Sequence, residues 1–385
     1  MNARIRVSEK ITSPEDQKVT FVELFFDLVF VFSVTQVVDL LHGGFDWLHA
    51  GQAVLIFWIV WWAWTQYTWA LNAADTTHTL VELAVLVATA LAFFMAIAVP
   101  EAFREGALRF AVPYVLMRGF GLVLYGWVAG QNPSQHAAVR TFSLVSLSGL
   151  AAVLLGAVLG GAAQYWLWGL AILLDVVAAG VGGQLEGWDL HPEHFAERHG
   201  LIVIIALGES LIVAAAGASS GLWRGELVAV AVLAVAVTCA LWWSYFTRAK
   251  PALDQALESR SGSAQSSMGR DVFSLLHFPI LGGIVAYAAV VEEMMIHPDE
   301  PPSFMIRLTL AIGVVFFLGG TAVAVWRATG RILIWRLALS AATAAAILLL
   351  TGSHALLILS VLFVGVAAAA FVEQRSKHLV VSRPI

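Results

Sequence analysis

Two carboxylates four residues apart, Glu23 and Asp27, stand in an otherwise apolar segment near the start of the chain. If this segment is a helix, the spacing places both side chains on one face. Thr35 and Gln36 follow about three turns later on the same segment. Paired carboxylates in apolar surroundings can attract a cation or exchange a proton, so these four residues are candidates for an ion or proton path.

A second group of polar residues lies between positions 191 and 199. Histidine together with carboxylate suits a zinc ion, but the spacing differs from the His-Glu-x-x-His pattern of zinc hydrolases. His194 and Glu197 could share a helical face, whereas His199 points elsewhere. We therefore expect no metal and no other cofactor, and the metal candidates that the pattern leaves are His191, His194 and Glu197. Glu197, Arg198 and His199 join the candidate polar network.

The other candidates are isolated polar residues within apolar segments. Each charge near the middle of a bilayer costs about 2.5–3.5 kcal/mol on insertion scales, so such residues need a partner or a function. One explanation is structural: Arg118 can pair with a carboxylate, and Asp27 can accept a hydrogen bond from an indole N–H. Carboxylates left over from such pairs would carry a proton or line a hydrated cavity. The isolated candidates are Glu82, Arg118, Asp175, Glu209 and His277.

Two further patterns at helical spacing are typical of packing. Tryptophans crowd the segment 50–71 at positions 58, 61, 62 and 64, where they either pack against other helices or form a cavity wall. Small residues recur every four positions in the segment 139–160, which lets another helix approach closely. They are Ser148, Ala152, Gly156 and Gly160.

The elements that must position these residues are membrane-spanning helices. The chain has 385 residues, 60% of them hydrophobic and 12% charged, and its mean hydropathy is +0.83. Because about a quarter of the residues are charged in a soluble domain, an ordinary water-soluble enzyme is excluded. Apolar stretches of about 20 residues recur without strand alternation, so the predicted fold class is all-α, a polytopic membrane protein. We predict about twelve transmembrane helices, at 20–41, 50–71, 78–99, 107–129, 139–160, 163–181, 197–217, 225–247, 271–292, 304–326, 332–351 and 353–373.

Basic residues are distributed unevenly between the two ends of these helices. With twelve helices, sixteen Lys and Arg residues fall on the side of the termini and four on the other side, while Arg118 lies within a helix. Because basic residues stay cytoplasmic during insertion, we predict a multi-pass protein of the cytoplasmic membrane with both termini in the cytoplasm. The N-terminal segment 1–19 lacks the apolar region of a cleavable signal peptide, and the tail is 374–385.

Two halves of the sequence carry similar patterns. Phe-x-Glu occurs at 21–23 and again at 195–197, and a Trp pair occurs at 61–62 and again at 242–243. The second set starts six helices after the first, so the halves have the same orientation and form parallel repeats. We predict six-helix repeats at 20–181 and 197–373, joined by a linker at 182–196. A stretch rich in Ser, Gly and Gln at 248–270 predicts a flexible cytoplasmic loop.

Two passages resemble the low-temperature-requirement A (LtrA) family of bacterial membrane proteins. The first is 19–36 (VTFVELFFDLVFVFSVTQ) and the second is 194–210 (HFAERHGLIVIIALGES). The resemblance covers residues 18 to about 373 and implies a bacterial membrane protein. The family name records a growth phenotype and implies no mechanism. The residues at the family's pattern positions are Glu23, Phe26, Asp27, Thr35, Gln36, Glu197, Arg198, Gly208 and Glu209.

The first passage is also similar, more distantly, to the Phe-Ser-Asp signature of six-helix-repeat potassium and proton channels of lysosomes and bacteria. That likeness implies that the first helix of each repeat lines a pore. This sequence departs from the signature at two places, since Phe26 replaces the central Ser and the second half has Gly200 and Leu201 instead.

These patterns favour a channel or transporter for a cation, proton or small solute, with carboxylates of the first and seventh helices in its path. Two alternatives are an intramembrane enzyme that acts on a lipid through Glu197, His199 and His194, and a membrane scaffold or assembly factor. A role without catalysis is favoured over an enzyme. Membrane lipids are the expected partners, a homodimer is compatible with the sequence, and no nucleic acid is expected.

Overall fold

Helices provide nearly all the regular structure of the chain. The computed structural model describes residues 11–14, 16–42, 44–130, 135–182, 190–217 and 225–376. Within these ranges the backbone forms α-helices, one short 3-10 helix and three π-helical turns. An isolated β-bridge joins Thr12 to Ala74. The prediction of an all-α fold is confirmed.

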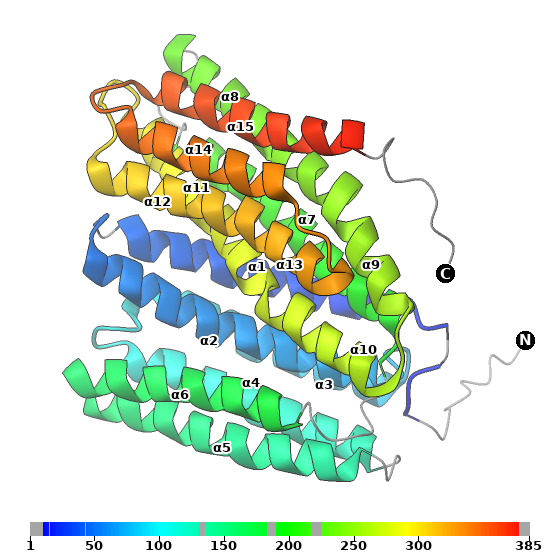
Figure 1. Cartoon of the computed structure of the whole chain (residues 1–385). Helices are drawn as coiled ribbons and strands as arrows, with labels where there is room; N and C mark the ends of the chain where they lie inside the picture. The colour runs from blue at the N-terminus through cyan, green and yellow to red at the C-terminus, as the bar shows by residue number, and fades with distance from the viewer. Residues whose placement is uncertain are drawn as a thin grey trace, which may run out of the picture. The chain divides into compact units, whose positions relative to one another are not determined.

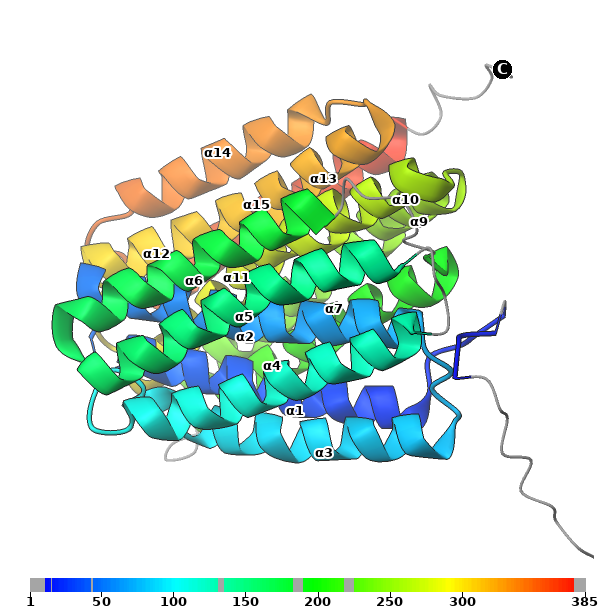
Figure 2. The same ribbon diagram turned by 90° about the horizontal axis from the view of Figure 1, so that it is seen from below.

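The chain divides into two compact units, and each is described separately. Unit 1 comprises Met1–Leu40, Gly51–Leu201 and Leu257–Arg270. In it α4 packs against α3 and α5, and α5 lies beside α6 in both Figure 1 and Figure 2. Its helices are α1 (Phe21–His42), α2 (Trp47–Asn72), α3 (Thr79–Ile97), η1 (Val99–Glu101), α4 (Ala107–Ala129), α5 (His136–Leu159), α6 (Gly161–Gly182), the first part of α7 (Pro192–Gly217) and α10 (Gly262–Met268).

Unit 2 comprises Leu41–Ala50, Ile202–Ala256 and Asp271–Ile385. In it α15 packs against α8 and α14, and α12 packs against α11 and α14. Besides the second part of α7, its helices are α8 (Gly225–Ser244), η2 (Tyr245–Ala249), α9 (Lys250–Glu258), most of η3 (Gly269–Leu275), α11 (His277–Ile296), α12 (Phe304–Val314), η4 (Val315–Gly319), α13 (Gly320–Thr329), α14 (Ile334–Leu349) and α15 (Ala355–Ser376).

The predicted spans correspond one to one with helices of the structure. Eleven helical stretches in the described ranges are long and apolar enough to cross a membrane. The segment predicted at 332–351 forms the shorter apolar helix Ile334–Leu349, which has 16 residues and falls below the usual length of about 20. The chain is therefore a polytopic helical membrane protein, and its described ranges contain eleven helices of spanning length and one shorter apolar helix.

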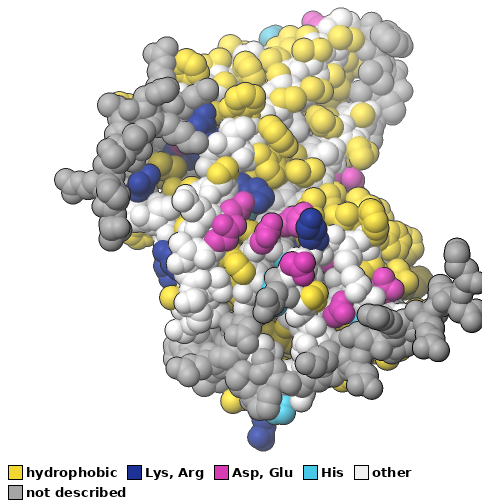
Figure 3. All heavy atoms as spheres, turned by 90° about the vertical axis from the view of Figure 1, so that its right-hand side faces the viewer, with side chains coloured by type: hydrophobic (Ala, Val, Ile, Leu, Met, Phe, Trp, Pro, Cys, Tyr) yellow, Lys and Arg dark blue, Asp and Glu magenta, His cyan; other side chains and the backbone are white. Residues whose placement is uncertain are grey.

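The outer sides of these helices are apolar, as lipid contact requires. Large hydrophobic side chains such as Phe21, Trp166 and Leu349 are largely exposed. On the face drawn in Figure 3, acidic and basic side chains gather near the middle, and hydrophobic side chains cover much of the surface above them. An apolar belt of this kind would be unfavourable in water, so these surfaces face lipid.

One predicted loop is wrong. The segment 248–270, predicted to be a flexible loop, is helical over most of its length, because α8 continues through the π-helical turn η2 into α9, and α10 runs directly into η3. Its apolar residues Leu253, Leu257 and Met268 are buried. The Ser, Gly and Gln content suggested a solvated loop, but these buried residues anchor the segment as helix.

The predicted close approach of a helix to the 139–160 segment occurs between α5 and α6. A Cβ atom on Gly156 would lie 2.8 Å from Cδ1 of Trp168, and the Trp168 indole donates a hydrogen bond of 3.0 Å to the Val153 carbonyl. Ala152 and Gly156 are buried in this contact, whereas Ser148 is exposed. The small-residue pattern thus identified the contact, although not every member of the stripe takes part.

This contact predicts that one methyl group added at Gly156 lowers the stability of the protein, whereas the same group added at an uncrowded glycine does not. We expect Gly156→Ala to lower the stability of the protein by about 1–3 kcal/mol, since a rigid indole must move. The matched control is Gly119→Ala in α4, where a Cβ atom would meet nothing within 4 Å. Thermal unfolding in detergent measures both variants. Equal melting temperatures for the two would contradict this account of α5–α6 packing.

Candidate functional site

Four charged or ionisable side chains of α1 and α7 meet in the interior of unit 1. They are Glu23, Asp27, His194 and Arg198, which we call the α1–α7 cluster, and all four are buried. Arg198 Nη2 lies 2.5 Å from Asp27 Oδ1, and Arg198 Nη1 lies 3.5 Å from Glu23 Oε1. His194 Nε2 lies 3.1 Å from Glu23 Oε1. One guanidinium therefore bridges both carboxylates that the sequence placed on a single helical face.

Local sequence explains how α1 presents these carboxylates. Thr20 precedes α1 and Glu23 lies in its first turn, which is the Thr-x-x-Glu spacing of a capping box. The Glu23 carboxylate accepts hydrogen bonds from Thr20 N at 3.0 Å and from Thr20 Oγ1 at 2.9 Å. Asp27 lies one turn further along and accepts a 2.8 Å hydrogen bond from the Trp64 indole. Glu23 thus caps the helix, and Asp27 accepts from an indole as its packing interpretation expected.

An amide on α2 fixes the start of α7. Asn72 Oδ1 accepts a hydrogen bond of 2.9 Å from the His191 backbone N–H, and its amide group donates to the His191 carbonyl at 3.0 Å. Pro192 follows as the first residue of α7, where its missing N–H costs nothing. The helix therefore starts five residues before the predicted boundary at 197, which brings His194 into the cluster.

Side chains contact both ring nitrogens of His194. Because Oδ1 of Asn72 accepts from His191, the group that faces His194 Nδ1 at 3.1 Å is the amide nitrogen Nδ2. His194 Nε2 lies 3.1 Å from Glu23 Oε1 and 3.4 Å from the amide nitrogen of Gln17. His194 therefore contacts α1, α2 and the segment that precedes α1.

The guanidinium of Arg198 alone cannot balance both carboxylates of the cluster. Glu23 and Asp27 contribute two negative charges, and Arg198 contributes one positive charge. Oδ2 of Asp27 is buried and has no hydrogen-bond partner among the described residues. A net charge buried in an apolar membrane protein is strongly unfavourable. The cluster is therefore built to bind one proton or one cation.

Aromatic rings enclose the cluster. The Arg198 guanidinium lies 5.5 Å from the centre of the Trp64 ring, and Trp64 meets the His199 ring edge-on with centroids 4.9 Å apart. Trp61 stacks on Trp64, and Trp58 stacks on Trp62. The tryptophans of α2 therefore form packed pairs, and Trp64 additionally forms part of the wall around buried charges.

A second buried arginine in unit 1 has a single acidic partner. Arg118 Nη2 lies 3.1 Å from Asp175 Oδ1, and Arg118 Nη1 donates to the Tyr114 hydroxyl at 3.0 Å. The backbone beside it is also held, since Gln66 donates to the Arg118 carbonyl and Tyr67 to that of Met117. This pair is electrically balanced, and it ties α2, α4 and α6 together.

Comparison with known proteins places the chain in a family. The chain matches the family described as bacterial low temperature requirement A protein (LtrA) over residues 18–371. The chain belongs to the LtrA family. A protein of Rhizobium meliloti (strain 1021), described as uncharacterized, is 30% identical over 318 residues, which cover 80% of this chain and 77% of the relative. No solved structure matches the chain.

Several candidates of this LtrA family member lie apart from the cluster. Glu197 is exposed, because α7 turns its His194 and Arg198 side toward α1. Thr35, Gln36, Glu82 and Glu209 are half-buried, and Thr35 Oγ1 donates to the Val31 carbonyl. The metal candidates do not gather either, and the described residues contain no group of three ligands that could hold a metal ion. Among the family's pattern positions in the second passage, Arg198 is thus the one that joins the cluster, next to His194.

His277 belongs to a different polar cluster, within unit 2. Its Nδ1 lies 2.9 Å from the Val272 carbonyl, and its Nε2 lies 2.7 Å from the Tyr245 hydroxyl. Tyr245 stands at the same position after its Trp pair as Trp64 does after the first pair. Each of these two aromatic residues hydrogen-bonds within a buried polar cluster. The internal repeat stays a prediction that this likeness favours.

Sequence reasoning missed the central residue of unit 2, Arg336. It was counted among the basic residues at the membrane surface, but it is completely buried. It donates to Thr321 Oγ1 at 2.7 Å and to the Ser244 carbonyl at 3.0 Å, and it forms a 2.8 Å ion pair with Glu373. The sequence does show polar residues in three other apolar segments, Glu373, Thr321 and Ser244, that could have indicated a buried partner. No spacing in the sequence links them to Arg336.

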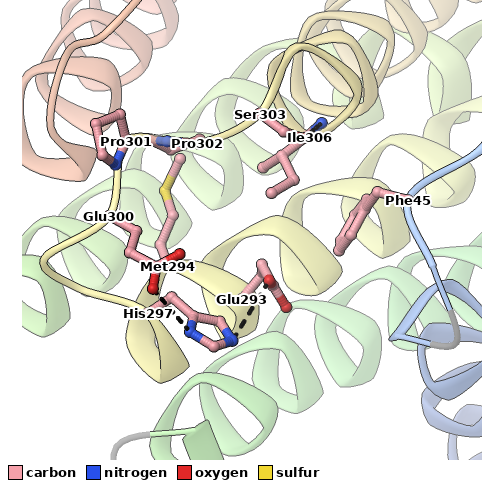
Figure 4. A pocket seen from close by; sticks show the side chains of 9 residues that line it. All are labelled: Phe45, Glu293, Met294, His297, Glu300, Pro301, Pro302, Ser303 and Ile306. Atoms are coloured by element: carbon pink, nitrogen blue, oxygen red, sulfur yellow. Dashed lines mark hydrogen bonds and ion pairs between the residues drawn. The ribbon is translucent and has the colours of Figure 1, made fainter.

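An acidic pocket lies at the turn between α11 and α12 in unit 2. Its volume is about 340 Å³. Figure 4 shows His297 between two carboxylates, with Glu293 at 3.8 Å and Glu300 at 4.0 Å from its ring nitrogens. Phe45 and Met294 provide apolar lining. The lining contains no Lys or Arg, so the pocket favours cations over anions.

The contacts of the α1–α7 cluster predict how the stability of the protein changes when the Arg198 guanidinium is removed. We expect Arg198→Gln to lower stability by about 3–5 kcal/mol, because it leaves two buried carboxylates without a countercharge. Asp27→Asn should change stability much less, since the amide oxygen still accepts from Trp64. Denaturant or thermal unfolding in detergent measures both.

The double variant provides the control. Adding Asp27→Asn to Arg198→Gln should recover part of the lost stability, because it removes one of the uncompensated charges. Strictly additive losses would show that the two side chains do not interact as described.

Proposed function

We propose that this protein is a channel or transporter for a cation, proton or small solute, and that the α1–α7 cluster binds the proton or cation that it moves. One observation carries the proposal. The cluster contains two carboxylates and a histidine around a single guanidinium, so Arg198 alone leaves it one positive charge short. Binding of a proton or cation at Asp27 would neutralise the cluster, and its release would restore the negative charge.

The position and surroundings of the cluster fit this role. Asp27 Oδ2 is the buried acceptor without a partner among the described residues, so it is the atom at which a proton would bind. Asn72, which holds the start of α7, also contacts His194 of the cluster. A change in charge could thus alter how α1, α2 and α7 are held together.

The enzyme alternative finds less support in the geometry. It relied on Glu197, His199 and His194 acting together, but Glu197 is exposed while the histidines are buried. His199 Nδ1 lies 2.8 Å from the Phe195 carbonyl, as expected for a packed helical histidine. The scaffold alternative gives both the α1–α7 cluster and the Arg118–Asp175 pair a purely structural role. It predicts that mutations at these two sites have similar effects, and this can be tested.

We also propose that both termini lie in the cytoplasm of a bacterial cell. The bias of basic residues supports this orientation, and it persists when the buried Arg336 and Arg307 are left out of the count. A fluorescent protein fused to the C-terminus should therefore fluoresce, and an alkaline phosphatase fused there should be inactive. The opposite pattern would reverse the orientation.

Proton flux into liposomes tests the transport proposal. Purified protein is reconstituted with a pH-sensitive dye inside, and a potassium diffusion potential drives the ions. We expect wild-type flux above that of empty vesicles and a loss of at least about tenfold in Asp27→Asn, because the proton-binding group is gone. Sodium and potassium flux are measured in the same vesicles.

Asp175→Asn is the matched control, since it removes a buried carboxylate that is paired with an arginine in the same unit. Its flux per folded protein should stay close to that of the wild type. If Asp175→Asn fails to fold, Tyr114→Phe serves in its place, because it removes only one hydrogen bond of that pair. The proposal is overturned if the wild type shows no flux of any of the three ions, or if Asp27→Asn and Asp175→Asn lose the same share of the flux.

A further inference from the structure

A basic pocket in unit 1 is independent of the transport proposal. It lies where α4 ends and α5 begins, and its volume is about 520 Å³. Two ionisable side chains, His136 and Arg140, and the hydroxyl of Ser143 line it. The remaining lining is small or apolar: Gly126, Ala129, Ala137 and Val139. Among the described residues, the lining contains no carboxylate that would repel an anion.

The polar residues of the pocket share one face of α5. His136 and Arg140 are one turn apart, and Ser143 follows three residues later. Both His136 and Arg140 are exposed, and neither makes a hydrogen bond or an ion pair with any residue in the described ranges. Their donors are therefore available to a ligand. An arginine with a free guanidinium is suited to bidentate binding of phosphate oxygens.

The depth of the pocket indicates where such a ligand comes from. It lies at the ends of two membrane-spanning helices, Ala107–Ala129 and His136–Leu159. Trp127 on α4 follows the pocket residue Gly126 and is partly exposed, and tryptophans of this kind are enriched at the membrane interface. Its ring packs edge-on against that of His78. A Cβ atom on Gly126 would meet nothing within 4 Å, so the pocket is open on that side.

We propose that this pocket binds the phosphate headgroup of an anionic phospholipid. Arg140 would bind the phosphate oxygens, His136 and Ser143 would donate hydrogen bonds, and the apolar wall of Val139 and Ala129 would contact the glycerol and the first acyl carbons. Basic pockets between membrane helices bind anionic headgroups on this physical basis. A soluble phosphate would gain the same polar contacts but none from the apolar wall.

Native mass spectrometry of the full chain tests the proposal. The protein is titrated with phosphatidylglycerol and, separately, with phosphatidylcholine of the same acyl chains. We expect the wild type to bind phosphatidylglycerol more tightly. Arg140→Gln should weaken this binding by about tenfold, as expected for the loss of one charge-assisted contact. His136→Gln should weaken it less, and binding of phosphatidylcholine should not change.

Arg109→Gln is the matched control, since it removes an exposed charge from the opposite end of α4. It should bind phosphatidylglycerol as the wild type does. The proposal is overturned if Arg140→Gln and Arg109→Gln weaken binding equally, or if the wild type does not distinguish the two lipids. Inorganic phosphate alone is titrated in parallel. If it binds as tightly as phosphatidylglycerol, the site is one for a soluble anion and the lipid assignment is wrong.

Discussion

Carboxylates buried inside a membrane protein need a countercharge, and Arg198 of α7 provides one to both carboxylates of α1. Its guanidinium contacts Asp27 and Glu23, Asp27 accepts from Trp64, and Glu23 meets His194. Removing the guanidinium would leave two carboxylates in apolar surroundings. The arrangement of α1, α2 and α7 within unit 1 therefore depends on one residue of α7.

Three of the buried arginines differ in how many acids they contact. Arg118 contacts Asp175, and Arg336 contacts Glu373. Arg198 contacts both Glu23 and Asp27. A pair of one guanidinium and one carboxylate is neutral by itself and fixes packing, whereas the cluster around Arg198 needs a further positive charge.

Arg336 shows that the same physics also shapes unit 2. It lies in the first turn of α14, where the helix dipole disfavours a positive charge. The ion pair with Glu373 and the hydrogen bonds to Ser244 and Thr321 offset that cost. Ser244 directly precedes the π-helical turn η2, and Thr321 lies two residues after the end of η4. Two of the irregular turns in unit 2 are thus anchored to one buried cation, and such turns are frequent at functional sites.

The sequence by itself determined that the chain is helical, crosses a membrane many times and carries Glu23 and Asp27 on one face, because hydropathy and helical period are local properties. It also indicated that Arg118 needs an acid and that α5 admits a close neighbour. Only the tertiary structure decided that Asp175 is the partner of Arg118, that Arg336 is buried and that Glu197 faces outward. Those outcomes depend on which faces of distant helices meet. The excess of carboxylates over guanidinium in the α1–α7 cluster is also a tertiary property, because it depends on Arg198 of α7 meeting both Glu23 and Asp27 of α1.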